Sequence, residues 1–317
     1  MGSLIGHAAS GLFFFLSGLW HLYSNVKLYL LQPNSFKSLP WFPTAKFRYL
    51  ELSLIILATS LYLVFELFVG PSNHHPFDKD GTNQLRNFQH SSTFMSFLVY
   101  AVFAILLDRV KPNNVSYGLT ELLAGLAFSL QLFNSRLRST DHAGVEGQYH
   151  MFLRPLIAVS LATTLTGIAR PNSFLVSFVR SASLLFQGSW LMVTGFMLWT
   201  PQLIAKGCFI NNENGQLVVR CHGSKALQRA RSLVNLQFSW FLISMASAAM
   251  SLYLLMVKQY SGERSEYRTM KSDKLLDERL EGIEVECLEE DGGLKKSSTI
   301  QMGSLHRPAD NKQTLVM

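Results

Sequence analysis

The sequence lacks the short motifs that mark common soluble enzymes. It contains no GxSxG elbow, no HExxH zinc motif and no phosphate-binding P-loop, so the familiar signatures of soluble hydrolases and nucleotide-binding enzymes are absent. No repeat of the solenoid type is visible. The first apolar run has no basic start and continues well past a typical signal-peptide segment. We therefore expect a retained first span rather than a cleaved signal.

Cysteine is scarce, with three residues in the chain. Two of them flank Asn214 and Gly215, a dipeptide that favours a two-residue hairpin turn because both of its positions require positive φ. This turn would place Cys208 opposite Cys221 at a non-hydrogen-bonded pair, where the Cα atoms approach to about 4.5 Å and a disulfide is feasible. Two reduced cysteines, or a metal-binding pair completed by His222, are the alternatives.

Long apolar runs dominate the first part of the chain. Each approaches or exceeds the length of about 17 to 20 residues that a helix needs to cross a bilayer. Because hydrocarbon offers backbone groups no hydrogen-bond partner, and because the runs do not alternate, they indicate helices. We predict an all-α membrane bundle of about seven transmembrane helices within residues 1–258, surrounded by a lipid bilayer. The predicted spans are Leu4 to Leu31, Phe47 to Val69, His90 to Leu107, Tyr117 to Phe133, Tyr149 to Ile168, Phe174 to Trp199 and Leu233 to Val257.

Residues 259–317 have a different composition. Charges crowd together, aromatic residues nearly vanish and no apolar run is long enough to span a membrane, which predicts a disordered tail. The stretch from Asp273 to Asp291 suits a short amphipathic helix that forms on a partner. We therefore expect any cytosolic protein partners to bind this tail.

Charge and the hairpin together bear on orientation. The net charge of +7 comes from basic residues in loops and near span ends, where they meet lipid headgroups, so nucleic-acid binding has no support. Basic residues occur on both faces, and the positive-inside tendency decides little. A bridge between Cys208 and Cys221 would persist only outside the cytosol. It favours an extracytosolic hairpin and a cytosolic tail, in the endomembrane system or the plasma membrane.

Histidines gather at one membrane face if seven spans are threaded. A helix through residues 142–150 would put His142, Glu146 and His150 on one side. Imidazole and carboxylate suit zinc or iron, and His90 would complete a candidate metal set. The alternative is a loop whose polar side chains satisfy backbone groups and lipid headgroups. The histidines predicted at this extracytosolic face are His7, His74, His75, His90, His142, His150 and His222.

Three polar residues stand out inside the spans: His21, Glu66 and Glu121. Such residues are costly unless they face the bundle interior, a partner or water, and they often mark ion or proton pathways. For Glu66, and for Glu51 near a span end, we favour the milder interpretation that the carboxylates reach lipid headgroups. His7 and His21 share a helix face, as in helices that hold two haems, but no other span offers matching histidines. This argues against haem.

Several of these segments resemble the transmembrane protein 45 family, and their amino-acid sequences are most similar to its plant branch. The similarity covers about residues 1–258, whereas Ser10, Arg136 and Arg138 depart from the expected pattern. The resemblance implies a multi-pass endomembrane or plasma-membrane protein of unknown biochemical activity, with plant members linked to virus infection. It implies no reaction or cofactor. The matching segments are Gly6 to His7, Gly18 to His21, Ser139 to His142, Glu146 to His150, Cys221 to His222 and Leu233 to Trp240.

Three functions follow as hypotheses. The first is a scaffold or receptor-like protein in stress or defence, which acts through the tail. The second is a metal-dependent membrane enzyme whose metal-bound water hydrolyses a lipid-linked group at the extracytosolic face. The third is an ion or proton transporter that uses Glu66, Glu121 and His90.

Overall fold

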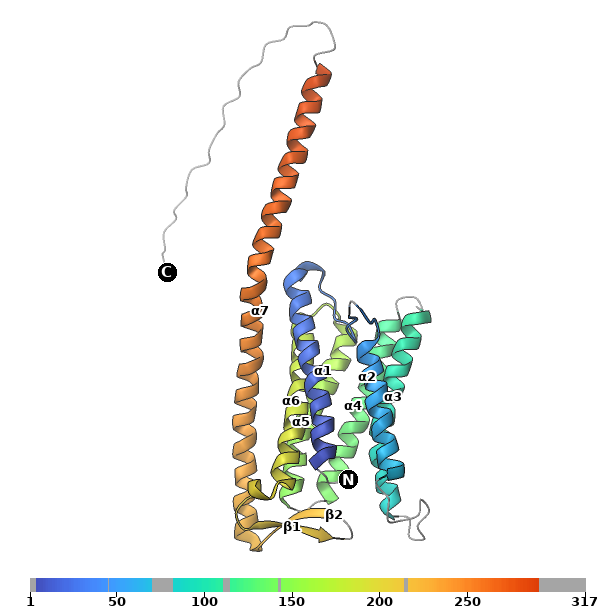
Figure 1. Cartoon of the computed structure of the whole chain (residues 1–317), viewed down its shortest axis with the longest axis vertical. Helices are drawn as coiled ribbons and strands as arrows, with labels where there is room; N and C mark the ends of the chain where they lie inside the picture. Colours follow the sequence, from blue (N-terminus) through green and yellow to red (C-terminus); the bar gives the residue numbers. More distant parts are fainter. Residues whose placement is uncertain are drawn as a thin grey trace, which may run out of the picture. The chain divides into compact units, whose positions relative to one another are not determined.

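The computed structural model describes residues 4–44, 46–69, 82–110, 115–141, 144–213 and 216–290. Side chains are described up to Tyr260, and at some positions within these ranges, His90 among them, only the backbone is. The long helices are α1 Leu4–Leu31, α2 Leu50–Val64, α3 Thr82–Val110, α4 Ser116–Asp141, α5 Val145–Ala169, α6 Phe174–Trp199 and α7 Gly223–Glu290 (Figure 1). The short elements are η1 Pro33–Ser35, η2 Phe65–Val69, η3 Pro201–Leu203, β1 Cys208–Glu213 and β2 Gln216–Cys221.

Six of the described helices are long and apolar enough to cross a membrane, and α4 is the long helix that falls outside this group. The predicted all-α membrane bundle of about seven helices is confirmed. The helix α4 is less apolar because it contains more polar residues, and some of these face inward. Thr120 and Glu121 are buried, while Leu122 and Leu126 are exposed. A membrane helix is expected to expose apolar side chains to lipid and to turn its polar side chains toward the bundle interior.

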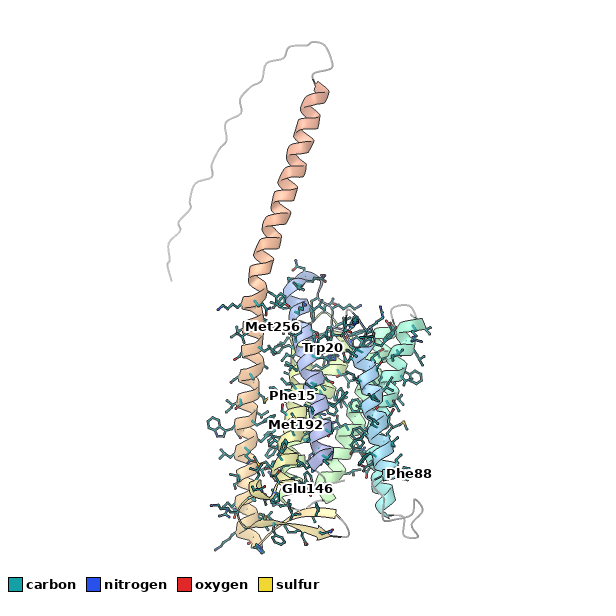
Figure 2. The ribbon with its side chains drawn as sticks, viewed as in Figure 1. Phe15, Trp20, Phe88, Glu146, Met192 and Met256 are labelled. Atoms are coloured by element: carbon teal, nitrogen blue, oxygen red, sulfur yellow. A yellow bond between two sulfur atoms is a disulfide. The ribbon has the colours of Figure 1, made fainter. Side chains whose placement is uncertain are left out.

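The helices α1 to α6 surround a central axis. Neighbouring pairs pack in the order α2, α3, α4, α5, α6 and α1, and α1 meets α2 through side chains described below. The tightest pair is α1 and α6, on which Figure 2 labels Phe15 and Met192. A Cβ atom at Gly188 would clash with the backbone of Phe15, and one at Gly18 would clash with the backbone of Leu185. Glycine thus lets these two backbones touch and leaves the pair little freedom to separate.

Residues 223–260 of α7 pack against α5, α6 and α1. Phe238 stacks on Phe152 with ring centroids 4.4 Å apart, and Met256 and Tyr260 pack against the cluster around Leu22. The backbone of α7 is helical to Glu290, and the disorder that the sequence predicts from Gln259 onward stays a prediction. A helix that is already formed adds further residues without a new nucleation step. By contacts the chain divides into residues 1–262 and 263–317.

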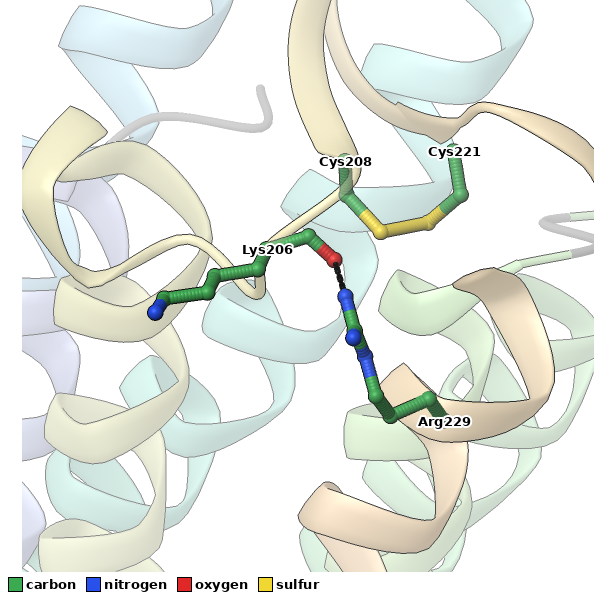
Figure 3. Close-up of a disulfide and its surroundings, with 4 residues drawn as sticks. All are labelled: Lys206, Cys208, Cys221 and Arg229. Carbon is green, nitrogen blue, oxygen red and sulfur yellow. Dashed lines mark hydrogen bonds between the residues drawn. A yellow bond between two sulfur atoms is a disulfide. The ribbon is translucent and has the colours of Figure 1, made fainter. Parts of the chain in front are cut away.

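The hairpin between α6 and α7 has the predicted antiparallel register, with Cys208 opposite Cys221. The structure joins these two cysteines in a disulfide with an S–S distance of 1.97 Å (Figure 3). His222 stacks on Phe209 instead, with ring centroids 4.6 Å apart. Arg229 of α7 donates a hydrogen bond to the carbonyl oxygen of Lys206. The hairpin is therefore tied both to itself and to the start of α7.

Candidate functional site

The axis of the helix ring contains two cavities of about 110 Å³ and 70 Å³. Both have room for several waters, since about 10–15 Å³ of such volume holds one. All six helices line each of them. The larger, the hairpin-end cavity, is lined by His7, Tyr62, Thr93, Gln131, His150 and Leu191 among others. The smaller, the loop-end cavity, lies toward the loop between α1 and α2 and includes His21, Glu51, Tyr100, Glu121, Thr164 and Arg180.

A buried ion pair forms one wall of the loop-end cavity. Arg180 of α6 donates to Glu121 of α4 across 2.5 Å, and the two side chains are 6% and 1% exposed. The second amino group of Arg180 donates to the Ser38 hydroxyl at 3.1 Å and to the Leu39 carbonyl at 3.0 Å. A buried charge needs this degree of pairing and hydrogen bonding to be tolerated. The pair therefore fixes α4, α6 and the α1–α2 loop together.

A second buried pair faces it across the cavity. His21 Nε2 of α1 lies 2.6 Å from Glu51 Oε1 of α2, and Glu51 Oε2 accepts a hydrogen bond from the Phe42 backbone at 2.9 Å. His21 is 6% exposed. In the described part of the chain its Nδ1 is buried without a hydrogen-bond partner. No described group therefore occupies this ring nitrogen.

The α1–α2 loop closes this end of the ring. Phe36, Trp41 and Phe42 are buried, the Tyr100 hydroxyl donates to the Pro40 carbonyl at 3.0 Å, and the Ser38 backbone donates to the Pro171 carbonyl at 2.7 Å. These contacts hold the loop against α3 and against the α5–α6 connection. The loop is thus part of the cavity wall rather than a free connection.

Histidines mark the hairpin-end cavity. The His7 ring lies between those of His150 and Trp199, with ring centroids 5.5 Å and 4.6 Å away. His150 Nε2 is 3.9 Å from Glu146 Oε1, one turn earlier on α5, and Figure 2 shows Glu146 at the hairpin end of the bundle. His7 and His21 do share one face of α1, as their spacing predicts, but each lines a different cavity.

An aromatic layer separates the two cavities. Phe14 of α1 and Phe97 of α3 line both of them. Their rings meet edge to face with centroids 5.6 Å apart, and Phe97 meets Phe128 of α4 in the same way, also at 5.6 Å. Since the same two side chains bound both cavities, an apolar layer lies between them.

The predicted metal set is only partly described. His142 lies outside the described residues, and the side chain of His90 does too. The shared face of His142, Glu146 and His150 depended on one helix through residues 142–150. Since α5 begins at Val145 after an extended Gly144, Glu146 and His150 alone share a described helix. Within the described residues no group of three His, Cys, Asp or Glu side chains is arranged to hold a metal ion. Zinc or iron binding stays a prediction.

The structure corrects the interpretation of two glutamates. Glu51 and Glu66 are not at lipid headgroups: Glu51 pairs with His21 inside the bundle, and Glu66 is 2% exposed within η2. Glu121 lies inside, where it pairs with Arg180. Arg180 was not among the candidate site residues that the sequence suggested. Its position seven residues into α6, between the buried Ser177 and Ser181, was a signal for an inward-facing charge.

Comparison with known families adds one match. Residues 117–254, from α4 into α7, match the model of a family described as a family of unknown function, DUF716. The match fits a multi-pass membrane domain and names no activity. The resemblance to the transmembrane protein 45 family stays a prediction. Together with the apolar helices, the match describes a multi-pass integral membrane protein.

Proposed function

We propose that the chain is a membrane transporter that moves protons, alone or in exchange for a small cation, along the axis of α1 to α6. The observation that carries this proposal is the pair of cavities placed end to end, each lined by all six helices and each with polar or ionisable side chains in its wall. Polar and ionisable groups inside apolar helices are expensive, and they typically belong to substrate or proton pathways.

The loop-end cavity supplies the proton-binding chemistry. Arg180 and Glu121 neutralise each other at 2.5 Å, so their net contribution to the cavity is small. His21 and Glu51 are different, because a neutral imidazole beside a carboxylate leaves a net negative charge that one proton cancels. Histidine is the side chain whose ordinary titration lies closest to neutral pH. We assign proton loading to this pair.

The aromatic layer supports a closed resting state. Apolar constrictions block ions and water because wetting them is unfavourable. Phe14 and Phe97 lie where such a barrier would stop passage between the cavities. Transport would then require the layer to open while the glycine-packed α1 and α6 stay together. The helices α2 and α3 are the natural moving elements.

Proton flux into proteoliposomes tests the proposal. The full chain is reconstituted with a trapped pH-sensitive dye, a pH gradient is imposed and the membrane potential is clamped with potassium and valinomycin. We expect flux above that of empty liposomes, and its loss in Glu51→Gln, which keeps the shape of the side chain but cannot ionise. His222→Gln, which changes a histidine outside both cavities, is the matched control and should retain flux.

Two results would refute the transporter. One is proton flux no faster than in empty liposomes. The other is equal flux in the unchanged chain and in Glu51→Gln, with both proteins monodisperse and reconstituted at the same density.

A scaffold or receptor-like role in stress or defence is the second candidate. It is favoured by the separation of residues 263–317 from the first unit by contacts and by the helical backbone up to Glu290. Cytosolic proteins captured by the full chain, but not by a chain ending at Gly262, would support it. Identical capture by both chains would count against it.

A further inference from the structure

The polar lining of the hairpin-end cavity is rich in hydrogen-bond acceptors. Side-chain oxygens come from Ser10, Thr93, Gln131, Asn134 and Ser135. The amide group of Asn134 donates to Thr93 Oγ1 at 2.7 Å and to the Gln89 carbonyl at 3.0 Å. The Asn134 amide group therefore already donates to protein acceptors, whereas most of the lining oxygens can still accept a hydrogen bond.

Two of these atoms are buried with no partner in the described part of the chain. Gln131 Oε1 and Ser135 Oγ lie one turn apart on α4, and neither has a hydrogen bond there. Leaving a buried polar group unsatisfied is destabilising. Buried polar groups are otherwise almost always paired with protein, water or a ligand. The amide oxygen of Gln131 can only accept, and the Ser135 hydroxyl can accept as well, so a guest that donates hydrogen bonds satisfies both atoms.

Aromatic side chains and nearby carboxylates indicate that the guest of this cavity is positively charged. Phe14, Tyr62, Phe94 and Phe97 line the same cavity, and aromatic faces attract cations. The buried Glu66 lies one turn beyond Tyr62 on the same chain segment, and Glu146 lies one turn before His150. The described lining contains no lysine or arginine. Neutral oxygens together with aromatic faces recognise an ammonium group better than a hard metal ion, which prefers carboxylates and water.

We infer that the hairpin-end cavity binds a small monovalent ammonium-type cation, with ammonium and methylammonium as the ions that its volume of about 110 Å³ admits. This inference rests on the proposed transport function, since it names the cargo that would move against protons. The cation donates to Gln131 and Ser135 on one side and faces the aromatic layer on the other.

Binding is tested on the full chain in detergent, where no transport is needed. The melting temperature is followed against methylammonium chloride, with sodium chloride at the same ionic strength as the reference. We expect a saturable rise in melting temperature with methylammonium alone. Gln131→Leu should weaken the apparent affinity about tenfold or more, because a hydrogen bond to a charged group contributes about 1.5–3 kcal/mol. Gln202→Leu makes the same change at an exposed position and should bind normally.

Ser135→Ala provides a second, smaller change in case Gln131→Leu does not fold. Equal shifts with sodium and methylammonium, or affinity unchanged in both Gln131→Leu and Ser135→Ala, would overturn the inference. Uptake of radiolabelled methylammonium into proteoliposomes then separates the two proposals. Binding without uptake or proton flux refutes the transporter and keeps the site. Proton flux without methylammonium binding refutes the site and keeps the transporter.

Discussion

The two cavities of the helix ring differ in how their polar groups are satisfied. At the loop end, charges are paired at short range: Arg180 with Glu121 at 2.5 Å, and His21 with Glu51 at 2.6 Å. At the hairpin end, the lining is mostly neutral, and Gln131 Oε1 is left buried without a described partner. Paired charges hold a structure together, whereas unsatisfied neutral groups leave room for a guest. Under the two proposals, the loop end holds the bundle together and binds the proton, and the hairpin end recognises the cation.

Breaking the charge pair at the loop end should have the largest effect. Glu121→Gln leaves Arg180 as a buried charge without its carboxylate, and losing one partner of a buried pair costs about 3–5 kcal/mol. We expect a large fall in melting temperature in detergent. Ser135→Ala at the hairpin end, which removes a buried hydroxyl with no partner among the described residues, should not lower the melting temperature.

An exposed ion pair supplies the control for this prediction. Arg48 of the α1–α2 loop lies 3.0 Å from Asp108 of α3, but its side chain is 59% exposed. Exposed pairs are screened by solvent and contribute little, so Arg48→Gln should have a far smaller effect than Glu121→Gln. Equal losses in the two variants would contradict the view that burial makes the Arg180 pair important.

Local features of this fold were predictable, and the long-range pairs were not. The spans follow from apolar runs, and the register of Cys208 with Cys221 follows from the turn propensity of the Asn-Gly dipeptide in the sequence between them, because both are encoded within short stretches. The partners Arg180 and Glu121 are 59 residues apart, and His21 and Glu51 are 30 apart. Nothing in a single sequence states which buried charges meet across a bundle.

The spacing of residues along α6 indicates which of its side chains face the bundle interior. On α6, Ser177, Ser181 and Gly188 recur at spacings of four and seven, and all are buried. A stripe of small and polar residues on an apolar helix indicates an interior face, and Arg180 stands beside that stripe. The cavities themselves need all six helices, so no motif in one helix could predict them.

Removing the disulfide should weaken the hairpin end specifically. Cys208 and Cys221 are separated by 13 residues, and a bridge closing a loop of this size contributes up to about 3 kcal/mol. We expect Cys208→Ser with Cys221→Ser to lower the melting temperature by less than Glu121→Gln does. Proton flux should remain, because His21 and Glu51 lie at the other end. A variant with normal stability and no flux would contradict this separation.

Opening the aromatic layer should merge the two cavities. Phe97→Ala removes the ring that meets both Phe14 and Phe128, so proton flux per folded chain should rise as the apolar barrier shortens. Phe97→Leu, which keeps more apolar volume, should give a smaller rise. Phe103→Ala on the same helix removes a ring that is 49% exposed and should leave flux unchanged. Flux that falls in Phe97→Ala at normal stability would argue that the layer guides transport rather than blocks it.

The smallest expected effect concerns the metal content of the purified protein. It distinguishes the two hypotheses for the hairpin end, a cation site and a metal site. If His150 lines a site for an ammonium-type cation, a nearby divalent ion would repel that guest, and we expect purified protein to contain far less than one zinc or iron per chain. The protein is prepared without chelators or metal-affinity tags, beside His142→Ala with His150→Ala, and both are measured by elemental analysis. About one metal per chain, lost in the double variant, would instead support the set of His142, Glu146, His150 and His90. The hairpin end would then be a metal centre, and hydrolysis by a metal-bound water would replace cation recognition as its chemistry.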